Sequence, residues 1–196
     1  TTVRFRRQWL ISRNPVREVE HWSNIPLSQG LAFRHHPDLI VNSFFEEDRG
    51  VIIAGLAVQP HQLRPQTEAL LAELYRADED KFDHLVIGLV GVYVVVRSTP
   101  SEVQIWTDPA GMMNVFYCSD CAASTPVLIP GVVRDQELET EFPFRGSDDW
   151  YPGSLCPFVG VKALLANHRL DLLDGEIRRF WPNKSIERKS ADDVLE

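Results

Sequence analysis

The sequence VGVYVVV at residues 90–96 decides the expected fold. Its apolar residues occupy both sets of alternating positions, whereas a strand with one face in water alternates apolar and polar side chains. We therefore expect this segment in the middle of a sheet that is covered on both faces. A second strand-like run at residues 102–107 follows the turn cluster STPS at residues 98–101, so the two runs predict a β-hairpin.

Outward from this hairpin, other short runs rich in β-branched and aromatic residues predict further strands. They fall at residues 7–12, 31–33, 39–45, 50–58, 85–97, 102–107, 114–119, 127–129, 169–173 and 177–181. The last two flank Asp174-Gly175, a dipeptide that favours a tight hairpin turn. Most of the predicted structure is therefore strand.

Helices are predicted singly between these strands. In residues 65–76, PQTEALLAELYR, the residues Leu70, Leu71, Leu74 and Tyr75 fall near one helical face, and a proline is typical of a first helical turn. A charged turn is expected to end this helix at residues 78–80. A shorter helix is predicted at 161–166 and another at 16–22. The pattern indicates an α+β protein with stacked sheets and outer helices.

The composition sets limits on the class of protein. A chain of 196 residues corresponds to one domain, which buries about 70% of its extended surface on folding. No apolar run approaches the roughly 18 residues that a membrane helix needs. The 28 acidic residues outnumber the 20 basic ones, for a net charge of −8, which argues against binding to phosphate backbones. We therefore expect neither a nucleic-acid nor a membrane partner.

The three cysteines, Cys118, Cys121 and Cys156, form no dense disulfide framework, and the first ten residues lack the apolar core of a signal peptide. We expect a cytoplasmic protein with reduced thiols. Together with His168 the cysteines could supply four zinc ligands. However, Cys118 is expected at the end of a strand, Cys121 in the following turn, and no second pair has regular spacing. We predict no metal, and no redox pair either, because no strand-to-helix context follows the C-x-x-C motif.

Several segments together resemble a known family. The order of VIIAGLAVQ, QTEALLAELY, LVGVYVVV, VQIWTDPAGMMNVFY and HRLDLLDGEIRRFWP is similar to that in the N-terminal class II glutamine amidotransferase domain of asparagine synthetase-like enzymes. The resemblance covers roughly residues 39–182. Asp108-Pro-Ala-Gly111, followed by an aromatic strand, matches the family's Arg-Asp-x-x-Gly turn, and Asp174-Gly175-Glu176 matches its final hairpin.

This resemblance implies a four-layer αββα sandwich of the N-terminal-nucleophile hydrolase type over residues 1–182. It also implies that residues 183–196 are a linker and the start of a helix leading to an asparagine synthetase-like domain, which would use ATP and Mg²⁺ to adenylate a carboxylate. From residues alone, the alternative is that the polar segment 183–196 is a disordered tail. We expect the domain to dock on its neighbour, or to form a homodimer, through Asp108, Gly111, Met112, Met113 and Trp181.

The residues that the family uses for glutamine hydrolysis do not match. A class II amidotransferase needs an N-terminal Cys, whereas this chain begins Thr1-Thr2, and we interpret Thr1 as a processed end. The family's Asn-Gly-Glu turn aligns with Ala54, Gly55 and Leu56. A methyl group cannot stabilise an oxyanion, and loss of such a donor costs about 10²–10³ in rate. The family's substrate-binding Asp aligns with Gln66, so no catalytic residue is expected.

The sequence thus predicts a catalytically inactive amidotransferase-like scaffold of an ATP-dependent amide-forming enzyme, in the style of β-lactam synthetases or lasso-peptide cyclases. Two alternatives remain. The chain could be a working amidotransferase domain whose N-terminal Cys has been removed or replaced. It could also be a stand-alone module that binds another small ligand in the former glutamine cleft.

Overall fold

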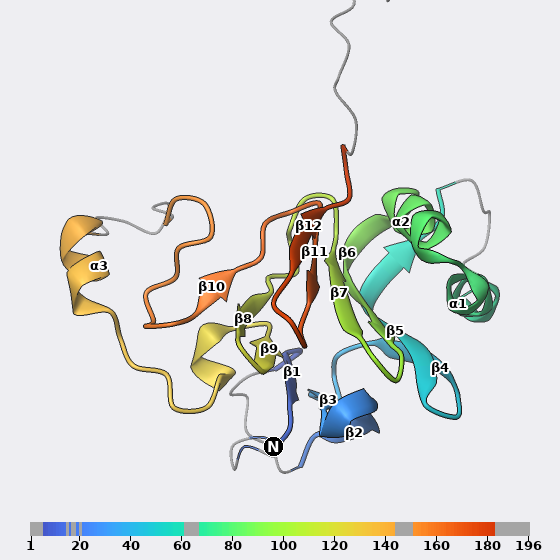
Figure 1. Ribbon diagram of the computed structural model, residues 1–196, viewed down its shortest axis with the longest axis horizontal. Helices are drawn as coiled ribbons and strands as arrows, with labels where there is room; N and C mark the ends of the chain where they lie inside the picture. The colour runs from blue at the N-terminus through green and yellow to red at the C-terminus, as the bar shows by residue number, and fades with distance from the viewer. Residues whose placement is uncertain are drawn as a thin grey trace, which may run out of the picture.

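The computed structural model describes residues 6–14, 16, 19, 21–60, 67–143 and 151–182. These residues form two six-stranded antiparallel sheets and three α-helices (Figure 1). The predicted α+β class is confirmed. Residues 183–196, expected to be a linker and a helix start, lie outside the described residues, as do Thr1 and Gln66.

The first sheet contains the hairpin predicted from VGVYVVV. Its strand order is β12-β11-β7-β6-β5-β4. The strands are β4 (Val41–Glu46), β5 (Arg49–Val58), β6 (Val90–Ser98), β7 (Val103–Thr107), β11 (His168–Asp171) and β12 (Ile177–Arg179). Strand β6 pairs with β7 from Val94↔Thr107 to Ser98↔Val103, which confirms the predicted hairpin. The second predicted hairpin is also confirmed, because β11 pairs with β12 around Asp174-Gly175.

The second sheet is built from shorter strands in the order β10-β8-β9-β1-β3-β2. The strands are β1 (Trp9–Ser12), β2 (Ser23–Pro26), β3 (Ala32–His35), β8 (Phe116–Cys118), β9 (Cys121–Ala123) and β10 (Lys162–Ala163). Strands β2, β9 and β10 were not predicted. They have two to four residues each, too few for a periodic pattern to stand out.

Two apolar cores cover the two faces of the first sheet. Between the sheets, Ile52, Val94 and Ile105 pack with Trp9 and Phe33 of the second sheet. On the opposite face, side chains such as Ile53, Val95 and Trp106 pack against helices α1 (Thr67–Arg76) and α2 (Glu79–Ile87). Tyr93, Val94, Val95 and Val96 are all fully buried, which confirms the expected cover on both faces for this part of β6. The expectation is wrong for the start of the strand, because Val90 is 50% exposed and Val92 is 42% exposed.

The outer face of the second sheet has a different cover from the one expected. There, Leu10 and Cys121 pack against Trp22, Leu128 and Phe158, which come from irregular segments and short 3-10 turns. Helix α3 (Gln136–Glu141) contributes no buried side chain and lies beside the sandwich (Figure 1). Among the described residues, the expected fourth layer is therefore present as loops and not as helices.

Four local predictions need correction. Residues 161–166 are not a helix, because Lys162 and Ala163 pair with β8 as strand β10. Residues 127–129 are not a strand; they lie in and beside the 3-10 turn Pro126–Leu128, whose first residue is a proline. Residues 78–80 do not only end α1 but also begin α2, where the Asp78 carboxylate accepts a hydrogen bond from the Lys81 amide at 2.9 Å. Residues 85–87 belong to that helix and not to β6.

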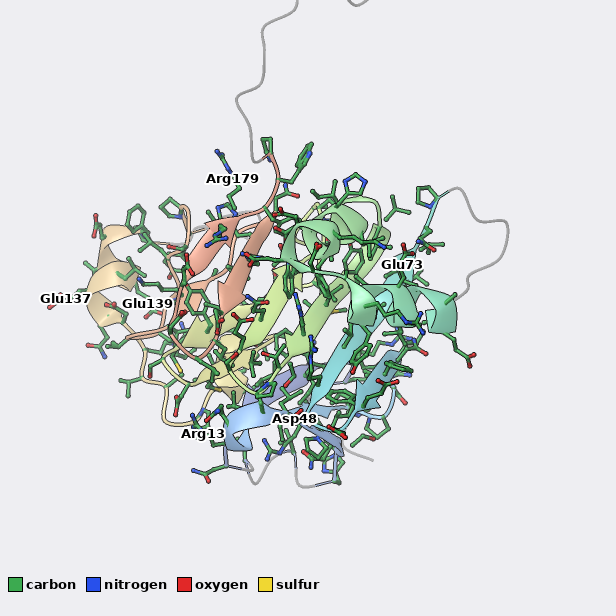
Figure 2. All side chains as sticks on the ribbon, turned by 45° about the vertical axis from the view of Figure 1, so that its right-hand side comes forward. Arg13, Asp48, Glu73, Glu137, Glu139 and Arg179 are labelled. Atoms are coloured by element: carbon green, nitrogen blue, oxygen red, sulfur yellow. The ribbon has the colours of Figure 1, made fainter. Side chains whose placement is uncertain are left out.

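The other helix predictions are closer to the structure. Helix α1 is confirmed from Thr67 onward, while residues 65 and 66 lie outside the described part. Around residues 16–22 the backbone makes i→i+3 hydrogen bonds, from Val19 to Val16 and from Trp22 to Val19, both 3.0 Å long. Charged side chains such as Asp48, Glu73 and Glu137 lie on the outside of the fold (Figure 2). Within the described residues, no helix is long and apolar enough to span a membrane.

Candidate functional site

The three positions that align with the family's Asn-Gly-Glu turn lie inside β5, not at its end. Ala54 is fully buried between the two sheets. Gly55 has φ of +101°, and a Cβ atom there would come within 2.2 Å of the carbonyl oxygen of Val92, so only glycine fits. Leu56 is 59% exposed and pairs directly with Val92, which is also exposed. The backbone geometry of the glycine is retained, while its neighbours are apolar.

Asp108 organises the turn that carries the second motif. Its side chain is fully buried, and its carboxylate accepts hydrogen bonds from the amides of Ala110 (3.0 Å), Met112 (3.0 Å) and Met113 (2.8 Å). The Gly111 amide also donates to the Asp108 carbonyl at 3.0 Å. Asp108 was expected on a docking surface. The structure corrects this, because its carboxylate is occupied by backbone amides and does not reach solvent.

The fold brings these two motifs together. A Cβ atom on Gly55 would lie 2.7 Å from the terminal methyl group of Met113, so the Met113 side chain covers the glycine. Met113 also packs against the core between the sheets. The side chains that meet at this place are a thioether, an alanine methyl group and an exposed leucine, none of which is polar.

The terminal hairpin lies next to the same turn. The Phe180 amide donates to the Asn167 carbonyl at 3.0 Å, and the Asn167 side-chain amide donates to the Pro109 carbonyl at 3.4 Å. Beyond this connection, Trp181 is 49% exposed, and Met112 on the turn is 65% exposed. Of the predicted interface residues, Met112 and Trp181 are thus exposed, whereas Met113 is partly buried.

An apolar groove of about 420 Å³ opens beside the turn. It lies between the turn, β8 and the segments that flank β10, and Leu155 and Leu165 on its walls are both exposed. The described residues that line it carry no charged side chain. They are Ala110, Gly111, Asn114, Phe116, Pro126, Tyr151, Gly153, Leu155, Pro157, Ala163, Leu164, Leu165 and Ala166. No local pattern in the sequence predicts this groove, because its two walls are 25 or more residues apart along the chain.

The proposed zinc ligands give no metal site. The described residues contain no group of three or more His, Cys, Asp or Glu side chains placed to hold a metal ion. Cys156 lies in the core outside the second sheet, whereas His168 lies on β11 of the first sheet. The absence of a bound metal in solution stays a prediction.

The side chains around the Asp108 turn are better suited to contact with an apolar surface than to catalysis. It presents methyl, thioether and aromatic groups, which neither attack an amide nor exchange protons at neutral pH. Comparison of the sequence with models of protein families gives no match, and comparison with curated proteins gives none.

Proposed function

We propose that this chain is a catalytically inactive amidotransferase-like domain of the N-terminal-nucleophile hydrolase type that serves as a scaffold. Its partner is an ATP-dependent asparagine synthetase-like domain of the same polypeptide. The observation that carries the proposal is the contact of Met113 with Gly55, which joins the two motifs of the family resemblance at one place and fills it with apolar atoms.

The loss of glutaminase chemistry follows from this contact. Hydrolysis of the glutamine amide needs hydrogen-bond donors aimed at the developing oxyanion. Ala54 has no donor in its side chain and is buried in the core, and Leu56 cannot replace the family's Glu. A polar substrate would also lose its hydrogen bonds to water beside the Met113 side chain without gaining replacements.

The scaffold role is supported by the surface around the Asp108 turn. Met112 on the turn is exposed, as is Trp181 after the terminal hairpin, and Ala110 and Gly111 of the turn line the apolar groove. Exposed apolar area of this kind is typical of protein interfaces. The carboxylate of Asp108 holds the turn rigid, which lowers the entropic cost of docking.

The direct test is expression of the reading frame that encodes this chain. The proposal expects a domain with the pyrophosphate-binding pattern Ser-Gly-Gly-x-Asp-Ser after residue 196, and binding between the two domains when they are produced separately. Leu165→Glu places a charge in the groove and should weaken this binding at least tenfold. Ala69→Glu, on the exposed face of α1 far from the groove, is the matched control and should leave it unchanged.

Two results would contradict the proposal. One is a reading frame without an ATP-using domain, which would favour a stand-alone module. The other is equal affinity for the Leu165→Glu and Ala69→Glu variants, which would exclude the groove from the interface.

A further inference from the structure

Cys118 and Cys121 face each other across a tight hairpin. Cys118 is the last residue of β8 and Cys121 the first of β9, and the two are directly paired in the antiparallel register. Sequence analysis expected Cys121 in the turn after β8. The structure corrects this, because the turn consists of Ser119 and Asp120 alone, and Cys121 lies in a strand that β1 holds in place through Leu10↔Ala123 and Ile11↔Ala122.

This register places the two cysteines at a spacing that a disulfide can bridge. Directly opposed residues in antiparallel strands have Cα atoms about 4.5–5.5 Å apart. A disulfide requires a Cα separation of about 4.4–6.8 Å. The hairpin can therefore accommodate the bond without a large backbone movement, and both thiols are free in the structure.

The two thiols differ in accessibility. Both line a pocket of about 260 Å³, which opens beside the turn after β1. Cys118 is partly exposed there, whereas Cys121 is only 3% exposed. The pocket is mainly polar, with Arg13 at the surface (Figure 2). Its described lining residues are Ser12, Arg13, Asn14, Cys118, Asp120, Cys121, Ile129 and Pro130.

The two thiols also differ in acidity. The adjacent Cys121 thiol and the amides of Asp120 and Cys121 favour the thiolate form of Cys118. They outweigh burial and the Asp120 carboxylate, one oxygen of which lies 3.9 Å from the Cys118 sulfur, so the pKa of Cys118 is lowered to about 6. The neighbouring Cys118 sulfur and burial raise the pKa of Cys121 well above its usual range. At neutral pH the accessible sulfur is thus a thiolate, and the buried sulfur keeps its proton.

The sequence context predicted no redox pair, but the hairpin register places the two thiols opposite each other. From this geometry we propose that Cys118 and Cys121 form a redox-active dithiol that is oxidised by small aliphatic disulfides. The Cys118 thiolate attacks one sulfur of the small disulfide, whose S–S bond breaks and releases one thiolate. Once Cys118 is in the mixed disulfide, its negative charge and its interaction with the Cys121 thiol are gone, which removes the main cause of the raised pKa of Cys121. Cys121 then gives its proton to the released thiolate, and its sulfur attacks the Cys118 sulfur. The mixed disulfide breaks, and the second small molecule leaves as a thiolate that takes a proton from water. The two protein thiols lose two electrons, and the small disulfide gains them.

Cys156 is an internal control for this chemistry. It is buried in the same apolar cluster as Cys121, but no pairing places a second thiol opposite it. Burial raises its pKa, so at neutral pH it is protonated and inaccessible. It should not react under conditions that oxidise the hairpin pair.

The experiment treats the reduced chain with oxidised glutathione at pH 7 and follows intact mass and peptide maps. The wild type should lose two hydrogen atoms through a Cys118–Cys121 bond, and Cys156→Ser should behave like it. Cys121→Ser should stop at a glutathione adduct on Cys118, and Cys118→Ser should react at least tenfold more slowly. Alkylation of Cys118 in the wild type should become independent of pH above about 7, in line with its lowered pKa.

Three outcomes would overturn the proposal. These are a wild type that accumulates the glutathione adduct without ring closure, Cys156 reacting as fast as Cys118, or an alkylation rate for Cys118 that rises with pH like that of free cysteine up to pH 8.5. The wild-type measurements need no substitution, so the test remains valid if a variant fails to fold.

Discussion

The indole nitrogen of Trp106 lies 2.7 Å from a carboxylate oxygen of Asp83 and donates a hydrogen bond to it. This contact joins β7 in the first sheet to helix α2. Arg169 on β11 completes the connection, with one guanidinium nitrogen 3.4 Å from Asp83 and another bonded to Glu79. Its guanidinium group also lies over the Trp106 ring, 5.8 Å from the centroid. A nearly buried cation therefore ties two strands to the helix that covers them.

Removing this cation should destabilise the protein in a pH-dependent way. Arg169→Met leaves Asp83 partly buried without its positive partner, which should cost about 3–5 kcal/mol of unfolding free energy at pH 7. Burial already raises the pKa of Asp83, and the substitution raises it further. A carboxylate with a raised folded-state pKa favours the folded state as pH falls, because the folded state then binds more protons.

The loss of unfolding free energy caused by Arg169→Met, as measured by urea unfolding, should therefore be smaller at pH 5 than at pH 7. The hydrogen bond from Arg169 lowers the pKa of Glu79, but that contribution disappears only at more acidic pH. Arg178→Met is the matched control, because this exposed arginine also pairs with Glu79, at 2.9 Å. Arg178→Met should lower the unfolding free energy much less than Arg169→Met, because solvent screens an exposed ion pair. Equal losses of unfolding free energy for Arg169→Met and Arg178→Met would contradict this account of the contacts around Arg169.

Asp108→Ala should destabilise the fold through the turn. The substitution leaves three buried backbone amides without their hydrogen-bond acceptor. We therefore expect the unfolding free energy, measured by chemical denaturation, to fall by about 3 kcal/mol. Asp174→Ala is the control, since Asp174 accepts a single hydrogen bond, from Glu176 at 2.7 Å, in an exposed turn. Asp174→Ala should lower the unfolding free energy by about 0.5–1 kcal/mol. A similar cost at both positions would mean that Asp108 does not organise its turn.

Two buried tyrosines should respond in opposite ways to removal of the hydroxyl group. The Tyr93 hydroxyl donates to the carbonyls of Val86 (3.1 Å) and Leu89 (3.4 Å), so Tyr93→Phe should cost about 1 kcal/mol. The buried Tyr117 hydroxyl has no hydrogen-bond partner among the described residues. Tyr117→Phe should be neutral or raise the melting temperature. A destabilised Tyr117→Phe would show that this hydroxyl has a partner in solution.

The chain should release no glutamate from glutamine. Ala54, Leu56 and the Met113 contact supply none of the required hydrogen bonds. Restoring an N-terminal Cys should not rescue turnover, because the oxyanion donor would still be absent. An enzyme-coupled glutamate assay with heat-denatured chain as background checks this. Glutamate above that background, or labelling of Thr1 by a glutamine-analogue diazo-ketone, would support the working amidotransferase instead.

Much of the fold could be predicted because its signals are local. The apolar run of β6, the helical period of α1 and the Asp174-Gly175 turn each lie within a few consecutive residues, and each was found in the structure. Helix α2 was missed because its buried residues, Phe82 and Val86, are few and its C-terminal part is as apolar as a strand. Residues 85–87 could thus be assigned to β6 by composition alone.

Local sequence patterns were enough to predict the two hairpins, the burial of residues 93–96 on both faces of the sheet and the α+β class. Three features depend on tertiary packing: the cover of the second sheet, the contact of Met113 with Gly55, and the pairing of Cys121 with Cys118. Periodicity reports which face of a segment is buried, whereas contacts between residues far apart in the chain depend on how all segments pack at once. The short strands β9 and β10 are stabilised by pairing with neighbouring strands, and no local sequence pattern predicts this pairing.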